Sequence, residues 1–196
     1  MNLENELKFI LAMDALKSVE RRNYNLDESR RENTAEHSWQ IVVLAQILYP
    51  YAKNKESISL LRVLRMLSIH DIVEIKAGDT FLFDGEAMIG KYERELEAAK
   101  SLFGMLDNSI GEEFLELWME FEAEDTPDAI FACAVDRIMP FLLNCSTSAK
   151  SWKEAGIKAS QVESMVGEAV RRASAEMGEL FYTLFEESIR NGKLLS

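Results

Sequence analysis

Residues 60–79 read LLRVLRMLSIHDIVEIKAGD, and this stretch decides the fold of the chain. An apolar run carries His70 and Asp71 side by side, with Glu74 shortly after them. The apolar residues recur at helical spacing, which predicts a helix over about Ser57 to Lys76. A histidine–aspartate pair is costly to bury in such a helix unless a partner satisfies it. A metal ion at a helix interface would be such a partner.

Two further acids lie close to this pair. Glu74 follows His70 by four residues and Asp71 by three, so it shares their side of the helix. Asp79 follows Gly78, at which the helix is expected to stop. The spacing therefore gathers three carboxylates and one imidazole at one end of a helix.

Two other helices are expected to complete the site. Asn33 can cap a helix that runs to about Leu48, with Glu36 completing a capping box, and His37 lies in its first turn. Asp136 stands in the apolar segment 130–139, where an uncompensated carboxylate would be costly. Two imidazoles and two carboxylates form a mixed nitrogen and oxygen set, which suits Mn²⁺, Fe²⁺, Co²⁺ or Zn²⁺.

Each of these residues also has a simpler explanation. His70 could be a core histidine that Asp71 holds in place. His37 could be a surface residue at a helix start, and Asp136 could form an ion pair with Arg137. The sequence leaves these alternatives open.

The rest of the chain predicts one all-α domain, a helical bundle without strands or linkers. Residues 21–31 are polar and lack periodicity, which is typical of a loop. Thr126-Pro127-Asp128 is a strong helix start, and that helix should continue to about Cys145. Further helices are expected from a face of Leu3, Leu7, Ile10, Leu11 and Ala15, over about 86–103, from the stripe Phe114, Leu117, Trp118 and Phe121, and over most of 160–189.

The bulk composition excludes several classes of function. The chain has 196 residues, and 22 Lys and Arg against 34 Asp and Glu give a net charge of −12. This charge argues against a nucleic-acid polymer or an anionic membrane as the partner. Two cysteines are too few for a secreted disulfide framework, and neither a signal peptide nor an apolar run of about 20 residues is apparent. We therefore expect a cytoplasmic protein. Its only imidazoles are His37 and His70.

The ordered motifs resemble those of the HD-domain metal-dependent phosphohydrolases, especially the small 5′-deoxynucleotidase-like branch. The motifs that carry this resemblance are Glu36-His37-Ser38, His70-Asp71-x-x-Glu74-x-x-x-Gly78-Asp79 and Val135-Asp136. The resemblance covers about residues 16–137. It implies a divalent metal (Mn²⁺, Co²⁺, Fe²⁺, Zn²⁺ or Mg²⁺), a small phosphorylated substrate such as a nucleoside 5′-monophosphate, and a homodimer. It implies that His37, His70, Asp71 and Asp136 are metal ligands, that Glu74 and Asp79 act in catalysis, and that Arg21 contacts the substrate phosphate.

One departure concerns the substrate. Where these enzymes have tryptophan after the arginine, this chain has Arg22, so preference for deoxynucleotides stays open and Arg22 is a second candidate for substrate binding. The alternatives are a phosphodiesterase, a nucleotide triphosphohydrolase, a non-catalytic nucleotide-binding module and an all-α interaction protein. The predicted domain spans residues 1–196, with the metal-site core over about 33–140 and the C-terminal helix over about 160–190.

Overall fold

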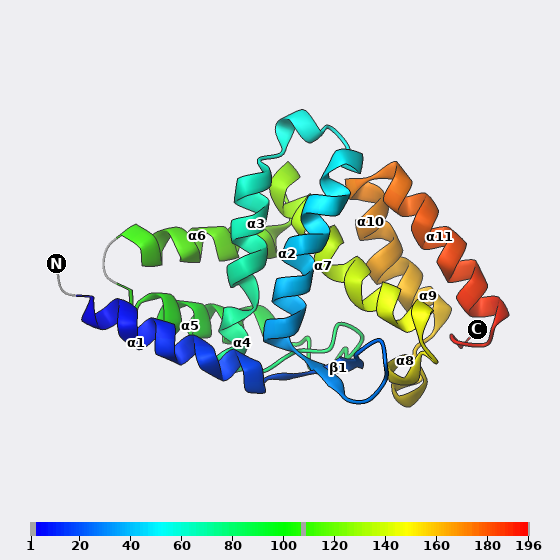
Figure 1. Ribbon diagram of the computed structural model, residues 1–196, viewed down its shortest axis with the longest axis horizontal. Helices are drawn as coiled ribbons and strands as arrows, with labels where there is room; N and C mark the ends of the chain where they lie inside the picture. Colours follow the sequence, from blue (N-terminus) through cyan, green and yellow to red (C-terminus); the bar gives the residue numbers. More distant parts are fainter. Residues whose placement is uncertain (1–2, 107–108, 196) are drawn as a thin grey trace.

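The helix that carries Asp136, α7 (Pro127–Ser146), is the central element of the fold. Thr126 caps it by accepting a hydrogen bond from the Ala129 amide, and Pro127 occupies its first turn, as the sequence predicts. In the computed structural model, which describes residues 3–106 and 109–195, other elements surround α7 (Figure 1). It contacts α2 (Thr34–Leu48), α3 (Leu60–Ile69), α6 (Ser109–Ala123), α10 (Glu168–Ala173) and α11 (Ala175–Arg190). Most of the buried apolar side chains lie between these helices.

The remaining elements confirm an all-α fold with one exception. A small antiparallel sheet pairs β1 (Glu20–Tyr24) with β2 (Arg31–Asn33) inside the segment predicted to be a loop. The prediction of no strands was therefore wrong, because these strands are too short and polar to show an alternating apolar pattern. The other elements are α1 (Glu4–Ala12), η1 (Met13–Ser18), η2 (Tyr49–Tyr51), η3 (Lys55–Ser57), η4 (His70–Val73), α4 (Glu74–Ala77), α5 (Lys91–Phe103), α8 (Lys150–Ala155), α9 (Ala159–Val162) and η5 (Glu163–Gly167).

The helix predicted over Ser57 to Lys76 consists of three pieces. Ser59 caps α3, which ends at Ile69, and the chain then tightens into the 3₁₀ turn η4 before α4. Gly78 follows with a φ of 77°, a left-handed value that glycine adopts without strain. His70 and Asp71 thus lie in a tighter turn, where an apolar pattern alone gives no sign that the α-helix is interrupted.

Two other predicted helices have different bounds. The helix expected from about 86 begins at Lys91, because Gly90 before it is left-handed. The helix expected over 160–189 is interrupted at Ser174, whose extended backbone ends α10 while its hydroxyl caps α11. By contrast, α2 has the predicted bounds and the predicted capping box of Asn33 and Glu36.

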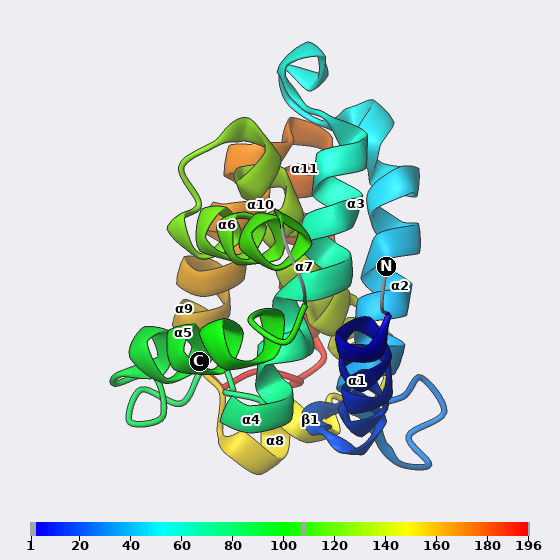
Figure 2. The ribbon, with the colours of Figure 1, turned by 90° about the vertical axis from the view of Figure 1, so that its left-hand side faces the viewer.

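The apolar face of α1 lies mostly outside the core. Phe9 is buried, and the face predicted from Leu3, Leu7, Ile10, Leu11 and Ala15 is exposed. On α2, a second apolar stripe of Trp39, Val43 and Ile47 is exposed as well. The two helices meet through η1, and Figure 2 shows α1 in front of the lower part of α2.

One described helix, α7, is long and apolar enough to cross a membrane by length and composition alone. The sequence analysis expected no such stretch. Of its most apolar window, 61% is buried inside the protein, which is typical of a core helix.

Candidate metal centre and active site

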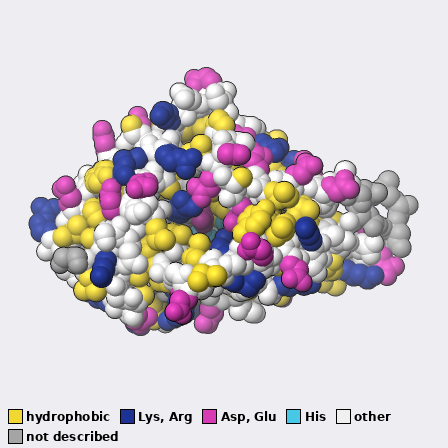
Figure 3. Space-filling view, turned by 180° about the vertical axis from the view of Figure 1, so that it is seen from behind, with side chains coloured by type: hydrophobic (Ala, Val, Ile, Leu, Met, Phe, Trp, Pro, Cys, Tyr) yellow, Lys and Arg dark blue, Asp and Glu magenta, His cyan; other side chains and the backbone are white. Residues whose placement is uncertain are grey.

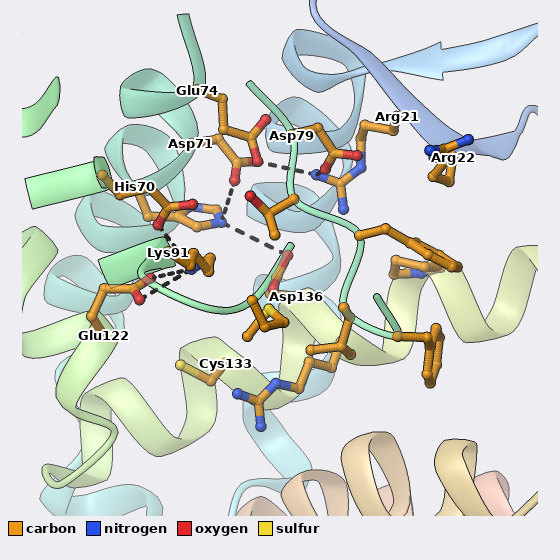
Figure 4. A pocket seen from close by; sticks show the side chains of 18 of the residues that line it. Arg21, Arg22, His70, Asp71, Glu74, Asp79, Lys91, Glu122, Cys133 and Asp136 are labelled. Atoms are coloured by element: carbon orange, nitrogen blue, oxygen red, sulfur yellow. Dashed lines mark hydrogen bonds and ion pairs between the residues drawn. The ribbon is translucent and has the colours of Figure 1, made fainter. Parts of the chain in front are cut away.

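A cavity of about 430 Å³ opens where β1, η4, α4, α5, α6 and α7 converge. Figure 3 shows basic and acidic side chains gathered around a hollow in the middle of one face. Seven of the eight sequence-predicted residues line this cavity and are labelled in Figure 4: Arg21, Arg22, His70, Asp71, Glu74, Asp79 and Asp136. His37 is fully buried in α2 and does not line the cavity.

The four predicted metal ligands lie together. His37 Nε2 is 2.8 Å from Asp136 Oδ1, and His70 Nε2 is 3.7 Å from the same oxygen. His70 Nε2 is also 3.0 Å from Asp71 Oδ1. The Nδ1 atom of His70 lies 3.2 Å from the Leu67 carbonyl, to which it can donate, and this leaves the Nε2 lone pair directed at the carboxylates.

This arrangement fits a divalent cation by its chemistry. Within residues 3–106 and 109–195, no three His, Cys, Asp or Glu side chains are spaced as the ligands of a formed metal site. The donor atoms contact one another instead, and His70 Nε2 is a buried atom without a hydrogen-bond partner. Two ligands bound at right angles to one ion lie roughly 3.0 Å apart, which is comparable with the 2.8 and 3.7 Å seen around Asp136. The residues present therefore suit the metal that the sequence predicts.

The pKa values of the clustered side chains also indicate that positive charge stabilises the site. Burial by itself would lower the pKa of His70, but Asp71 and Asp136 outweigh it and raise that pKa well above its ordinary value. Burial would raise the pKa of Asp71, but the neighbouring His70 lowers it to about 2. The hydrogen bond with His37 and the charge of the nearby His70 likewise overcome burial and hold the pKa of Asp136 well below its usual range. Cationic charge between these carboxylates stabilises the site, whether a proton or a metal supplies it.

Arg21 extends from β1 into the acidic side of the cavity. Its guanidinium lies 3.6 Å from Asp79, 3.9 Å from Asp71 and 3.6 Å from Glu32. Burial opposes the charge of Arg21, yet the surrounding carboxylates raise its pKa above the ordinary arginine value. Its side chain is 12% exposed, so part of this cation can reach a ligand in the cavity.

Glu74 and Asp79 are held beside the proposed ligands. Burial, with Asp71 nearby, raises the pKa of Glu74 well above its ordinary value, and burial also raises the pKa of Asp79. The Thr34 hydroxyl donates a 2.8 Å hydrogen bond to Glu74 Oε2 and fixes that carboxyl at the start of α2. Ser38 donates to Asp71 Oδ2 at 3.1 Å.

The structure excludes some of the simpler explanations for His37, His70 and Asp136. His37 is not a surface residue, since it is fully buried. Asp136 does not pair with Arg137, which instead forms an ion pair with Glu124. His70 does contact Asp71, as a core histidine would, but it shares Asp136 with His37. Both cysteines are free thiols, with Cys133 buried and Cys145 half-buried.

Several site residues were not found from the sequence. Glu32 is 2% exposed and lies 3.6 Å from both Arg21 Nε and His37 Nδ1. Its position directly before the capping residue Asn33 was the only signal for it. At the opposite end of the cavity, Lys91 Nζ lies 2.8 Å from Glu95 and 3.1 Å from Glu122. These three side chains come from α5 and α6, whose packing the sequence pattern does not specify.

The comparisons with known proteins agree with this geometry. A family model described as "HD domain" matches residues 13–178. A crystal structure of a protein described as a predicted metal-dependent phosphohydrolase, from Magnetospirillum magnetotacticum, is 41% identical. The superposition has a TM-score of 0.92 and covers 99% of this chain and 96% of the crystallised chain.

Curated relatives named 5′-deoxynucleotidase HDDC2 are 26% identical over 137 residues in Danio rerio and 28% identical over 132 residues in Homo sapiens. The matches cover 69% and 67% of this chain, and 66% and 62% of those relatives, so the chain matches just under two thirds of their length. The family model spans most of the chain and the fold superposes closely on a solved relative. The chain therefore belongs to the HD-domain family.

Proposed function

We propose that this protein is a metal-dependent phosphohydrolase that hydrolyses a phosphate monoester, most simply a (deoxy)nucleoside 5′-monophosphate to nucleoside and phosphate. One observation carries the proposal. Two buried imidazoles converge on Asp136 at the base of a cavity that also holds a buried arginine and two carboxyls with raised pKa values. The names of the relatives support the same reaction class.

His37, His70, Asp71 and Asp136 would hold the metal. When bound, a divalent cation supplies Lewis acidity to a phosphate oxygen and lowers the pKa of a bound water. The ion would be Mn²⁺, Co²⁺, Fe²⁺, Zn²⁺ or Mg²⁺, which these nitrogen and oxygen donors all accept.

In this proposal, the protein's own groups bind and orient the ester. Arg21 would bind the scissile phosphate through its forked guanidinium. Glu74, held by Thr34, would orient the attacking water and accept its proton. Asp79, which lies 3.6 Å from the Arg21 guanidinium, would assist the leaving oxygen.

The apolar lining of the cavity suits a flat apolar group. A nucleobase gains stacking energy against aromatic rings and prefers such a surface to water. This lining includes Phe81, Leu82, Phe83, Met88, Phe121, Phe141, Trp152 and Val166. This composition favours a nucleotide over a small sugar phosphate.

The decisive test uses protein stripped of metal. Restoring Mn²⁺, Co²⁺, Zn²⁺ or Mg²⁺ is expected to restore phosphate release from a panel of nucleoside monophosphates. His70→Ala should lower both bound metal and kcat by more than about 100-fold. Glu113→Gln, on the exposed face of α6, serves as the control and should change neither.

Two outcomes would contradict the proposal. If no metal restores phosphate release, the protein is not a metal-dependent phosphohydrolase. If His70→Ala still binds the full amount of metal, the assigned metal site is wrong. Product analysis with cyclic nucleotides and nucleoside triphosphates distinguishes phosphodiester and triphosphate hydrolysis from monoester hydrolysis.

We further propose that the protein is a cytoplasmic homodimer that binds neither membranes nor nucleic-acid polymers. Its two free thiols are compatible with a reducing compartment. The C-terminal helix α11 packs Met177, Phe181 and Phe185 into the core. The exposed stripes of α1 and α2 are therefore the surface we assign to a second copy.

A further inference from the structure

The strand β1 is irregular beside the cavity. Glu20 pairs with Asn33 and Tyr24 with Arg31, so three residues of β1 face the single residue Glu32 of β2. In a regular strand, successive side chains point to opposite faces. Here the irregularity lets Arg21, Arg22 and Asn23 all line the same cavity.

The third of these residues anchors the distorted strand. Asn23 is buried, and its side-chain oxygen accepts hydrogen bonds from Asn144 at 3.1 Å and Ser151 at 3.3 Å. These contacts join β1 to α7 and α8, which fixes the segment that presents both arginines. The fold itself therefore holds Arg22 at the cavity.

Arg22 differs from the other cations that line the cavity. Arg21 forms ion pairs with Asp71 and Asp79, Lys91 forms them with Glu95 and Glu122, and Arg137 pairs with Glu124. In the part of the chain that the structure describes, the Arg22 guanidinium takes part in no hydrogen bond or ion pair. It is the cation of this cavity that is available to bind an anion.

Arg22 also lies between two cavities. A second hollow of about 590 Å³ shares Arg22, Phe81 and Phe83 with the first. The other cation of the second hollow, Arg31, forms an ion pair with Glu154 at 3.4 Å. Figure 4 shows Arg22 beyond Arg21, at the end of the first cavity away from Lys91 and Glu122. A ligand that fills the apolar part of the cavity and extends outward would meet Arg22.

We propose that Arg22 determines specificity by binding a second phosphate group, carried by the leaving group of the substrate away from the scissile phosphate. This inference rests on the proposed function, in which Arg21 and the metal centre take the scissile phosphate. Carboxylates outnumber basic groups around the cavity, so a second phosphate is repelled except beside an unpaired guanidinium. The preferred substrate class is a bisphosphorylated small molecule, such as a nucleoside 3′,5′-bisphosphate.

The test compares matched substrates on the metal-loaded protein. One pair is a nucleoside 5′-monophosphate with the 3′,5′-bisphosphate of the same base, and the other is fructose 6-phosphate with fructose 1,6-bisphosphate. The wild-type protein is expected to favour the bisphosphate of a pair by about tenfold or more in kcat/KM. Arg22→Gln should lower kcat/KM for the bisphosphate by about 10- to 100-fold and change that for the monophosphate by less than about twofold.

Two variants control for charge and folding. Arg22→Lys keeps the charge without the fork and should retain part of the preference. Arg30→Gln, on the same hairpin, removes an exposed arginine that pairs with Glu36 and lines neither cavity, and it should behave as wild type.

The outcomes separate this inference from the proposed function. If Arg22→Gln lowers turnover of both members of a pair equally, Arg22 holds the scissile phosphate and the inference is wrong. An unchanged bisphosphate preference in Arg22→Gln also overturns it. If the wild-type protein hydrolyses none of the four compounds, the proposed function fails. In that case, calorimetry measures the Kd of each compound for wild type and for Arg22→Gln. The ratio of these Kd values for the bisphosphates decides whether Arg22 binds a second phosphate.

Discussion

At the residue scale, the site depends on groups that hold the reactive side chains in place. Thr34 is fully buried at the first position of α2, and its hydroxyl is the hydrogen-bond donor to Glu74. Glu74 begins α4 in a different part of the chain. One hydrogen bond thus fixes the proposed catalytic carboxyl against the helix that carries His37.

Replacing Thr34 with valine keeps the shape of this residue and removes the donor. We expect kcat to fall about tenfold with little change in KM, because Glu74 loses the hydrogen bond that orients it while Arg21 still binds phosphate. Steady-state kinetics and the metal content of the purified variant test this expectation.

Two further variants show whether the effect is one of position. Thr34→Ser restores the hydroxyl and should recover most of the wild-type kcat. Thr183→Val removes an exposed hydroxyl that donates to the Glu179 carbonyl in α11, and it should have no effect. An unchanged kcat in Thr34→Val would show that Glu74 needs no donor there.

At the element scale, ion pairs connect helices whose apolar contacts alone do not fix their relative positions. Arg62 of α3 donates to Glu120 of α6, with Nε at 2.9 Å, and Thr126 at the start of α7 donates to the other carboxylate oxygen at 2.6 Å. The Glu120 side chain is 15% exposed. Burial alone would raise the pKa of Glu120, but the hydrogen bonds from Arg62 and Thr126 outweigh it and lower that pKa.

This shift predicts a pH-dependent contribution to stability. Because the pKa is lower in the folded state, the stabilisation is fully present above the unfolded value of about 4.3 and is lost as the pH falls through the folded value. Glu120→Gln should therefore lower the free energy of unfolding by about 1 kcal/mol at pH 7, with a difference that shrinks below about pH 4.

Urea denaturation of wild type and variant at several pH values measures this difference. Glu113→Gln is the matched control, since Glu113 lies on the same helix and its ion pair with Arg65 is more exposed than that of Glu120. A difference between wild type and Glu120→Gln that stays constant as the pH falls from about 5 to about 2 would contradict the assignment.

At the scale of the whole molecule, the exposed apolar side chains are unevenly distributed. Trp39 is 69% and Ile47 60% exposed on α2, and Leu11 is 65% exposed on α1. Monomeric proteins rarely leave large contiguous apolar patches in water. A stable homodimer through this face would cover them.

Ile47→Glu is expected to convert the dimer to a monomer, because it places a charge in the proposed contact without disturbing the core. Light scattering coupled to size exclusion measures the mass, and circular dichroism checks the fold. Leu61→Glu provides the control, since Leu61 is 70% exposed on α3 and belongs to neither stripe. A monomeric wild-type protein would show that there is no such interface. A dimeric Ile47→Glu variant would show that the interface lies elsewhere.

The helical fold, the capped starts of α2 and α7, and a candidate set of site residues could be predicted from the sequence alone. Helical periodicity and cap chemistry are local, so Asn33 with Glu36 and Thr126 with Pro127 could be recognised without neighbours. His70, Asp71 and Asp136 stood out because charged groups in apolar segments need partners.

Only the tertiary structure decided which groups face one another. The irregular register of β1, which brings Arg22 to the cavity, and the burial of Glu32 beside His37 are not specified by the local sequence. The break before His70 and the exposure of the α1 face depend on what packs against these helices. Such contacts join residues far apart in the chain, and their free energy is fixed by packing in three dimensions.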